Sequence, residues 1–239
     1  MYSLRGKAAV ISDLHLGSVT CLHHQIMHFL KAVHAGEYSL LVIAGDLLEN
    51  TNRLRMESRD WKVLSKLRKM SNDLDIVWVN GNHDAYHPEV VAALLGIHYV
   101  GEDYRVLTKN NTVVCIHGHQ FDKYISKHLW TTFVLGWLYL LIQRFDRRHR
   151  IAHTVKRWTK NVSACAPRVK NGALEVYHDG NQFVICGHTH KAEIDQENQY
   201  ANTGSWTELR GNYIIIDEDG NVDLKEWQEE IKWDNQQSI

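Results

Sequence analysis

Short apolar segments recur along this chain and alternate with amphipathic ones. The apolar segments lie at residues 8–12, 39–44, 75–80, 112–117 and 182–187. Runs of this length that are rich in Val and Ile predict buried β-strands. Residues 22–35 and 57–70 carry apolar side chains at helical spacing, so they predict α-helices. Strands alternating with helices indicate an α/β fold with helices on both faces of the sheet.

Two later segments depart from this alternation. Residues 192–226 contain short alternating runs, such as 213–216, with Gly-Asn turns at 211–212 and 220–221. This pattern predicts a β-meander that closes a second sheet. Residues 124–165 predict a long, mostly helical insertion between two strand-end motifs. We expect residues 1–239 to form a single domain with this insertion as a helical cap, because the length needs no second core.

The composition is that of an ordinary globular protein. Hydrophobic residues make up 44%, charged residues 23%, and the net charge is −1. A charge near zero predicts no polyanionic partner, so we expect no specific nucleic-acid or protein partner. The four cysteines show no paired spacing and the start of the chain lacks a long apolar run. Both features predict reduced thiols and a cytoplasmic location.

Polar side chains follow the predicted strands at the edge where open α/β sheets bind ligands. The five motifs are Asp13-x-His15, Gly45-Asp46, Gly81-Asn82-His83-Asp84, His117-Gly118-His119 and Gly187-His188-Thr189-His190. In extended backbone, residues i and i+2 share a face, so the D-x-H and H-x-H motifs would each direct two ligands into one cavity. Together they offer two aspartates, one asparagine and four histidines.

So many ligands exceed what one metal ion uses while keeping a position open, but two ions that share a carboxylate can use them. Two cations about 3.5–4 Å apart clamp the attacking and leaving oxygens of a phosphoryl displacement. A histidine beside them can protonate the leaving group. Imidazole, carboxylate and amide ligands without thiolate suit manganese, iron, cobalt or zinc, and we favour manganese for its preference for oxygen.

These motifs, in this order over about residues 8–206, resemble those of the calcineurin-like metallophosphoesterases. The resemblance implies a four-layered α-β-β-α sandwich and attack on phosphorus by a metal-bridged hydroxide. It also implies that His83 is the general acid, oriented by Asp84. The implied metal ligands are Asp13, His15, Asp46 and His190 for the first ion, with Asp46 bridging, and Asn82, His117 and His188 for the second.

The predicted cap combines apolar and basic character. Residues 129–142 are nearly all apolar, but they are too short to cross a bilayer, which takes roughly 20 residues. From Arg144 to Lys170 the chain carries nine Lys or Arg against one acidic residue. An interfacial cap over residues 129–170 would rest on anionic lipid, bind acyl chains or position substrate phosphates. The alternative is a structural cap with a solvated basic face.

This cap resembles one branch of the family, the UDP-2,3-diacylglucosamine pyrophosphohydrolases, as do residues 45–49 and Asp122. The resemblance implies a phosphorylated or lipid-linked substrate and a place on the cytoplasmic membrane face. Two positions depart from that branch: His83 replaces its usual Arg, and His119 replaces its usual Asp. A related enzyme for another phosphodiester or pyrophosphate therefore fits as well. We expect His119 and Asp122 to contact substrate or to hydrogen-bond to the metal ligands.

Two further alternatives stay open. One is a soluble phosphodiesterase or phosphomonoesterase whose cap is only structural. The other is a non-catalytic scaffold on the same fold, as in the retromer subunit that resembles these enzymes. The presence of all seven ligands and of His83 disfavours the scaffold. A Ser/Thr protein phosphatase is excluded, because residues 45–51 lack the expected G-D-x-V-D-R-G segment.

Overall fold

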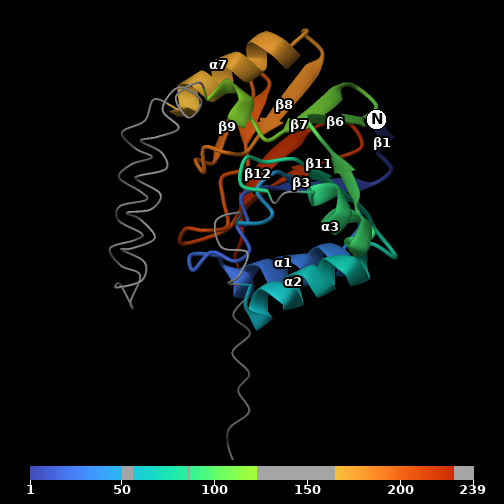
Figure 1. The fold of residues 1–239 in the computed structure, drawn as a ribbon. Helices are drawn as coiled ribbons and strands as arrows, with labels where there is room; N and C mark the ends of the chain where they lie inside the picture. Colours follow the sequence, from blue (N-terminus) through green and yellow to red (C-terminus); the bar gives the residue numbers. More distant parts are fainter. Residues whose placement is uncertain (50–55, 85–86, 123–164, 229–239) are drawn as a thin grey trace, which may run out of the picture.

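The computed structural model describes residues 1–49, 56–84, 87–122 and 165–228. Two six-stranded sheets pack face to face, and helices cover the outer face of each (Figure 1). The predicted α-β-β-α sandwich is therefore confirmed. The predicted cap lies outside the described residues, except for Cys165 at its end. The extent of the domain and of the cap stay predictions.

The first sheet holds three of the predicted strands at its centre. Its order is β12-β11-β2-β3-β4-β5, and β2 to β5 are mutually parallel, whereas β11 and β12 run antiparallel to their neighbours. The bounds are β2 Lys7–Ile11, β3 Tyr38–Ala44, β4 Asp75–Val79, β5 His98–Val100, β11 Asn212–Ile216 and β12 Val222–Glu226. The carboxyl ends of β2, β3 and β4 therefore meet at one edge.

The second sheet brings the other two motif-bearing strands together. Its order is β1-β6-β7-β8-β10-β9, with β7 parallel to β8. The bounds are β1 Tyr2–Ser3, β6 Asp103–Leu107, β7 Thr112–Ile116, β8 Gln182–Cys186, β9 Glu193–Asp195 and β10 Tyr200–Asn202. The β-meander prediction for residues 192–226 was wrong in arrangement. The β9–β10 hairpin extends this sheet beside β8, whereas the β11–β12 hairpin extends the first sheet beside β2.

The helices lie on opposite sides of the sandwich. Helices α1 (His23–Ala35), α2 (Ser58–Met70) and α3 (Pro88–Leu95) cover the first sheet, and α7 (Cys165–Tyr177) covers the second (Figure 1). A short 3₁₀ helix, η2, spans His119–Phe121. Helix α3 was not predicted; it starts with Pro88 at a position where its missing N–H costs nothing. Within the described ranges, no helix is long and apolar enough to cross a bilayer.

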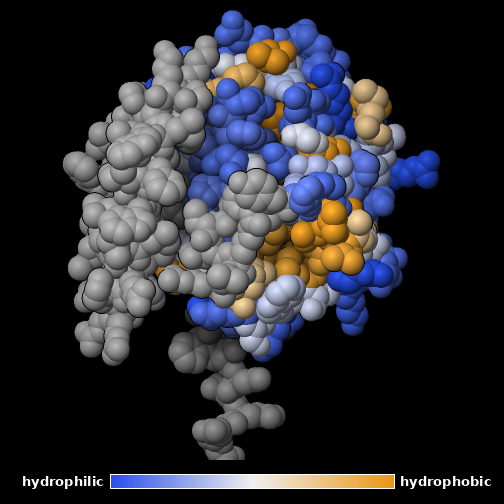
Figure 2. Space-filling model, viewed as in Figure 1, coloured by the Kyte–Doolittle hydropathy of each residue, from blue (hydrophilic) through white to orange (hydrophobic). Residues whose placement is uncertain are grey.

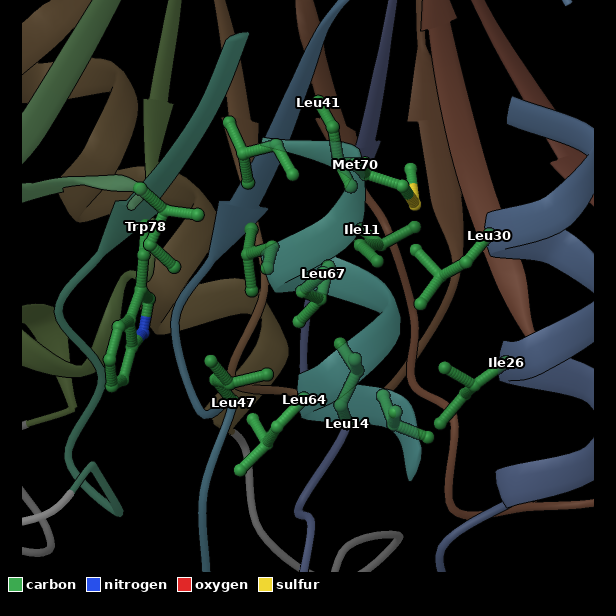
Figure 3. Packing of buried hydrophobic residues seen from close by; sticks show 14 of the residues in the cluster. Ile11, Leu14, Ile26, Leu30, Leu41, Leu47, Leu64, Leu67, Met70 and Trp78 are labelled. Carbon is green, nitrogen blue, oxygen red and sulfur yellow. The ribbon is translucent and has the colours of Figure 1, made fainter. Parts of the chain in front are cut away.

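The central strands are apolar throughout because both of their faces are buried. In β3, Val42 joins the core between the two sheets, whereas Leu41 and Ile43 join the core under the helices. Leu67 of α2 and Trp78 of β4 belong to this second core (Figure 3). A period of two along a strand thus places alternate side chains in the core between the sheets and in a core under the helices, of which there is one on each side of the sandwich.

No disulfide joins the four cysteines in the structure. Cys21, Cys115 and Cys186 are buried. Burial raises the pKa of Cys186 to about 12, so this thiol stays protonated at neutral pH. We therefore treat these cysteines as part of the core.

Leu67→Ala is expected to lower the free energy of unfolding by about 2–5 kcal/mol, since it deletes a fully buried side chain and leaves a cavity. Urea denaturation measures the change. The control is Leu94→Ala, at a residue that is 74% exposed on α3, which should stay within about 0.5 kcal/mol of the wild type. Equal losses in the two variants would contradict the packing described here.

Candidate metal centre

The loops that carry the predicted ligands are joined by backbone hydrogen bonds. The N–H of Asp13 donates to the carbonyl of Gly45 at 3.1 Å, and the N–H of His15 donates to that of Asp46 at 3.0 Å. The loops after β2 and β3 therefore run side by side. The N–H of His188, after β8 in the other sheet, donates to Asp13 Oδ2 at 2.9 Å. This bond ties the two sheet edges together at the site.

One group of ligand atoms gathers around Asp13. Asp13, His15 and His190 offer ligand atoms that all lie within 4.8 Å of one another. His190 Nε2 lies 2.9 Å from Asp13 Oδ1 and 3.2 Å from His15 Nε2. Asp13 and His15 are almost fully buried. These are the residues predicted to hold the first ion together with Asp46.

A second group gathers around His117. Its Nε2 lies 3.4 Å from Asp46 Oδ2 and 3.1 Å from Asn82 Oδ1. Its Nδ1 donates to the carbonyl oxygen of Ala44 at 2.9 Å, which directs Nε2 toward the site. Asp46 Oδ2 also lies 3.6 Å from His15 Nε2, in the first group. Asp46 therefore stands between the two groups, where a bridging carboxylate is needed.

His188 completes the second group from the other sheet. Its ring centroid lies 5.2 Å from that of His117. Its Nε2 lies 3.4 Å from Asp122 Oδ2, which also accepts a hydrogen bond from Cys165 Sγ at 3.0 Å. Although His188 and His190 are two residues apart, they belong to different groups. All seven predicted ligands thus come to one edge of the sandwich, and their role as ligands stays a prediction.

The backbone at these ligands is not the extended one that the sequence suggested. Asp13, His15, Asp46, His188 and His190 all have φ between 50° and 66°. Within the described ranges only two other non-glycine residues have positive φ. The prediction that extended backbone places the two ligands of D-x-H and of H-x-H on one face was therefore wrong. These residues adopt a left-handed backbone conformation, which Asp tolerates better than most residues, and this conformation orients their side chains toward the site. Each non-glycine residue in this conformation costs about 1–3 kcal/mol of folding free energy, and such backbone strain is typical of functional sites.

The donor set fits divalent metal ions. Asp13 Oδ1 is buried, with the Nε2 atoms of His190 and His15 at 2.9 and 3.7 Å, and these two imidazole nitrogens lie 3.2 Å from each other. Burial opposes ionisation of Asp46, but the imidazoles of His117 and His83 hold its pKa far below the usual value. Burial likewise opposes a charge on His117, yet the Asp46 carboxylate raises its pKa to about 9. Without a metal, Asp46 and His117 thus stabilise each other's charge, and a divalent cation would take the place of the imidazole proton beside the carboxylate.

Glu49 is a site residue that the motifs did not predict. One carboxylate oxygen lies 3.0 Å from His15 Nδ1 and the other 2.9 Å from His83 Nδ1. Glu49 is three residues beyond Asp46, and its N–H donates to the carbonyl of Leu16 at 2.9 Å. The only signal in the sequence was its place in the Gly45–Glu49 segment.

His83 lies at the rim of the site, beside the ligands rather than among them. Its side chain is 39% exposed, and its ring centroid lies 5.0 Å from that of His15. Its backbone N–H donates to Asp46 Oδ1 at 2.8 Å. The carboxylate beside His83 Nδ1 belongs to Glu49, and an orienting role of Asp84 toward His83 stays a prediction.

Asp84 supports the loops. Its carboxylate accepts hydrogen bonds from the N–H groups of Asp46, Leu48 and Gly81 and from Trp78 Nε1, at 2.6 to 3.1 Å. Burial and the neighbouring Asp46 raise its pKa to about 6. Asp84 therefore fixes the turn that presents Asn82 and His83.

The two tentative substrate residues flank the second group. The ring centroid of His119, in η2, lies 5.4 Å from that of His117. Its Nδ1 is buried without a hydrogen-bond partner, and burial lowers its pKa to about 4. Asp122 contacts His188, as described above. Both side chains therefore lie beside the second group, and contact with a substrate stays a prediction.

Gly81 leaves room for the Asp46 carboxylate. A Cβ added there would lie far closer than 3.0 Å to Asp46 Oδ1 and to the Asp46 backbone nitrogen. Gly81→Ala is therefore expected to weaken metal binding at least about 10-fold, in the range seen when supporting contacts of ligands are lost. Metal titration by calorimetry measures this. Gly101→Ala, where a Cβ meets nothing within 4 Å, should bind metal normally, and equal affinities would contradict the close approach.

Comparison with known proteins identifies the family. The family model described as calcineurin-like phosphoesterase matches residues 6–192. No curated protein matches the sequence. The similar solved structures have low sequence identity. Vps29 from Chaetomium thermophilum is 14% identical, with a TM-score of 0.48 over 93% of this chain and 97% of that one.

Two solved enzymes are similar to the same degree. The nuclease MPE from Pseudomonas putida is 14% identical, with a TM-score of 0.44 over 91% of this chain and 87% of that one. The cold-active protein-tyrosine phosphatase from a psychrophilic Shewanella is 12% identical, with a TM-score of 0.45 over 95% and 82%. At such identities these likenesses concern the fold alone.

Proposed function

The chain belongs to the calcineurin-like phosphoesterases, and on that premise we propose that it hydrolyses a phosphodiester or pyrophosphate bond with two divalent metal ions. Manganese is the favoured metal, with iron or zinc as alternatives. When bound, two such ions polarise the phosphoryl group and bring the pKa of a water molecule close to neutral pH. The observation that carries the proposal is the place of Asp46 Oδ2, between His117 and His15.

The protein's own residues hold the reacting groups and move one proton. Asp13, His15, Asp46 and His190 would hold one ion, and Asp46, Asn82, His117 and His188 the other. His83 would donate a proton from Nε2 to the leaving oxygen, while Glu49 holds Nδ1 at 2.9 Å. The donor is the imidazolium form, whose Nδ1–H bonds to the Glu49 carboxylate while Nε2–H holds the proton to be given, and the carboxylate thus orients the ring.

Several residues around the metal centre bear on the identity of the substrate. The position of the cap, residues 45–49 and the contact between Asp122 and His188 support an enzyme resembling the UDP-2,3-diacylglucosamine pyrophosphohydrolases. His83 and His119 favour a different phosphodiester or pyrophosphate. In either case the 129–170 cap would meet a lipid-linked substrate or the anionic cytoplasmic face of a membrane.

The experiment is hydrolysis of bis(p-nitrophenyl) phosphate by manganese-loaded protein. Chelation of the metal should abolish hydrolysis, and added Mn²⁺ should restore it. Protein that binds two ions yet cleaves no phosphoester would instead support the non-catalytic scaffold. A substrate panel of nucleotide-sugar lipids, cyclic nucleotides, dinucleotides and phosphomonoesters then identifies the class. Vesicle flotation of protein lacking residues 129–142 tests the membrane proposal, which fails if binding is unchanged.

A further inference from the structure

A groove of about 530 Å³ lies between α2 and α3. This volume is within the range of about 300–1,000 Å³ that is usual for ligand pockets. Leu64 of α2 and Leu95 of α3 form its buried floor, and both are less than 9% exposed. Figure 2 shows a hydrophobic region over these helices on the viewed face. The groove is therefore large enough for a ligand and is apolar at its base.

The rim of the groove is apolar as well. Trp61 of α2 is 56% exposed and Leu94 of α3 is 74% exposed, and both line the groove. Continuous exposed apolar surface of this kind marks a binding site more often than isolated apolar residues do. Among the described residues that line it, those with a charged or hydroxyl side chain are Glu49, Ser65 and Arg68. Of these, Glu49 is engaged by His15 and His83, and Arg68 Nη1 hydrogen-bonds to neighbours at the end of its own helix.

One end of the groove reaches the candidate metal centre. Leu16 and Leu48, which line it, follow His15 and Asp46 in their loops and pair with each other as a β-bridge. Glu49 lines the same end and is the residue that contacts both His15 and His83. A molecule lying in the groove can therefore extend directly to the place of the reacting phosphate.

We propose that this groove binds an unbranched alkyl chain attached to the phosphate that the metal centre holds. The substrates are then amphiphilic phosphate esters whose apolar arm lies between α2 and α3. The inference rests on the proposed function, which places the phosphate at the metals. Continuity with the metal centre favours a substrate arm over a second copy of the chain or another protein, and the scarcity of polar lining favours an alkyl chain.

Binding of two phosphonates to manganese-loaded protein tests this proposal. Methylphosphonate and octylphosphonate share a head group, and their C–P bond is not a phosphoester bond, so binding is measured apart from catalysis. Each buried methylene strengthens binding about 4-fold, so burial of three to four of them makes octylphosphonate bind about 100-fold more tightly. Isothermal titration calorimetry gives both dissociation constants.

Variants at the rim of the groove test whether the alkyl chain of octylphosphonate binds there. Leu94→Lys and Ser65→Trp should each reduce the ratio of the two dissociation constants below about 10-fold. Both residues are exposed, so the fold should tolerate the change. Val176→Lys on α7, at an apolar residue that is 62% exposed outside the groove, is the matched control and should keep the full ratio. A wild-type ratio near one, or a ratio unaffected by both rim variants, would overturn the proposal.

Measurements on the same manganese-loaded protein distinguish failure of the groove proposal from failure of the proposed phosphoesterase function. Hydrolysis of bis(p-nitrophenyl) phosphate together with equal binding of the two phosphonates overturns the groove proposal alone. Chain-dependent binding that the rim variants remove, without hydrolysis of any phosphoester, overturns the proposed function and leaves the groove as a site for alkyl phosphonates.

Discussion

Asp46→Asn is expected to reduce phosphodiester hydrolysis by more than about 100-fold and to lower the bound manganese from two ions to one or none. Loss of contacts that merely support a metal ligand costs about 10–100-fold, and a bridging ligand should cost more. Asparagine keeps the size of the side chain, but its amide nitrogen cannot bind a cation. The second oxygen of Asp46, held by the N–H of His83 at 2.8 Å, would be affected as well.

Metal content and turnover are measured on the same sample. Asp223→Asn is the matched control, because Asp223 is exposed and its nearest cation, Lys225, is 3.5 Å away. The control should keep two ions and full turnover. Full activity with two ions in Asp46→Asn would show that the carboxylate does not bridge.

His83→Ala is expected to lower turnover by roughly 10²–10⁴-fold while both metal ions remain bound. The ring lies at the rim of the site and is absent from the seven predicted ligands, so its removal should leave the ions in place. A proton donor matters most when the leaving group is a strongly basic alkoxide. The loss should therefore be large for dialkyl phosphates and small for p-nitrophenyl esters, whose leaving group departs as a stable anion.

This dependence on the leaving group separates proton donation from a merely structural role, which would slow all substrates alike. The control is His178→Ala, since His178 is an exposed histidine beyond the end of α7 whose Nδ1 lies 3.3 Å from the Gln182 carbonyl oxygen, away from the metal centre. Equal losses for both ester types in His83→Ala would remove His83 from the role of general acid.

The positions of the ligand motifs could be predicted because they follow directly from the ends of the strands. Val- and Ile-rich runs between residues 39 and 44 or 182 and 187 are continuous because both strand faces are buried, so each strand and its end could be located. In the structure the strands end within about one residue of the predicted positions. Parallel strands then bring their carboxyl ends together, and the polar side chains that follow them converge.

What could not be predicted depends on contacts between distant loops. Glu49 reaches His15 and His83 only because the loops after β2 and β3 run side by side. Nothing local to Glu49 signals that pairing. The left-handed backbone at Asp13 and His188 likewise occurs where a hydrogen bond between these two residues joins the two sheets, and no local pattern signals that contact.

The division of residues 192–226 between two sheets also depends on contacts between segments that are distant in the sequence. Strands β9 and β10 are three residues each, so their own sequence carries little information about their partners. Strand β10 pairs with β8 in parallel, although β9 separates it in the chain from the loop that carries His188 and His190. The alternation of apolar residues predicted strands there, but it could not say which sheet edge each hairpin would join.

The central claim is that seven side chains hold a pair of cations that share Asp46. A crystal structure of manganese-loaded protein, with anomalous scattering recorded near the manganese edge, tests it most directly. The account predicts two peaks about 3.5–4 Å apart, one beside Asp13 and His190 and the other beside His117 and His188. A single peak, or manganese bound away from Asp46, would contradict it.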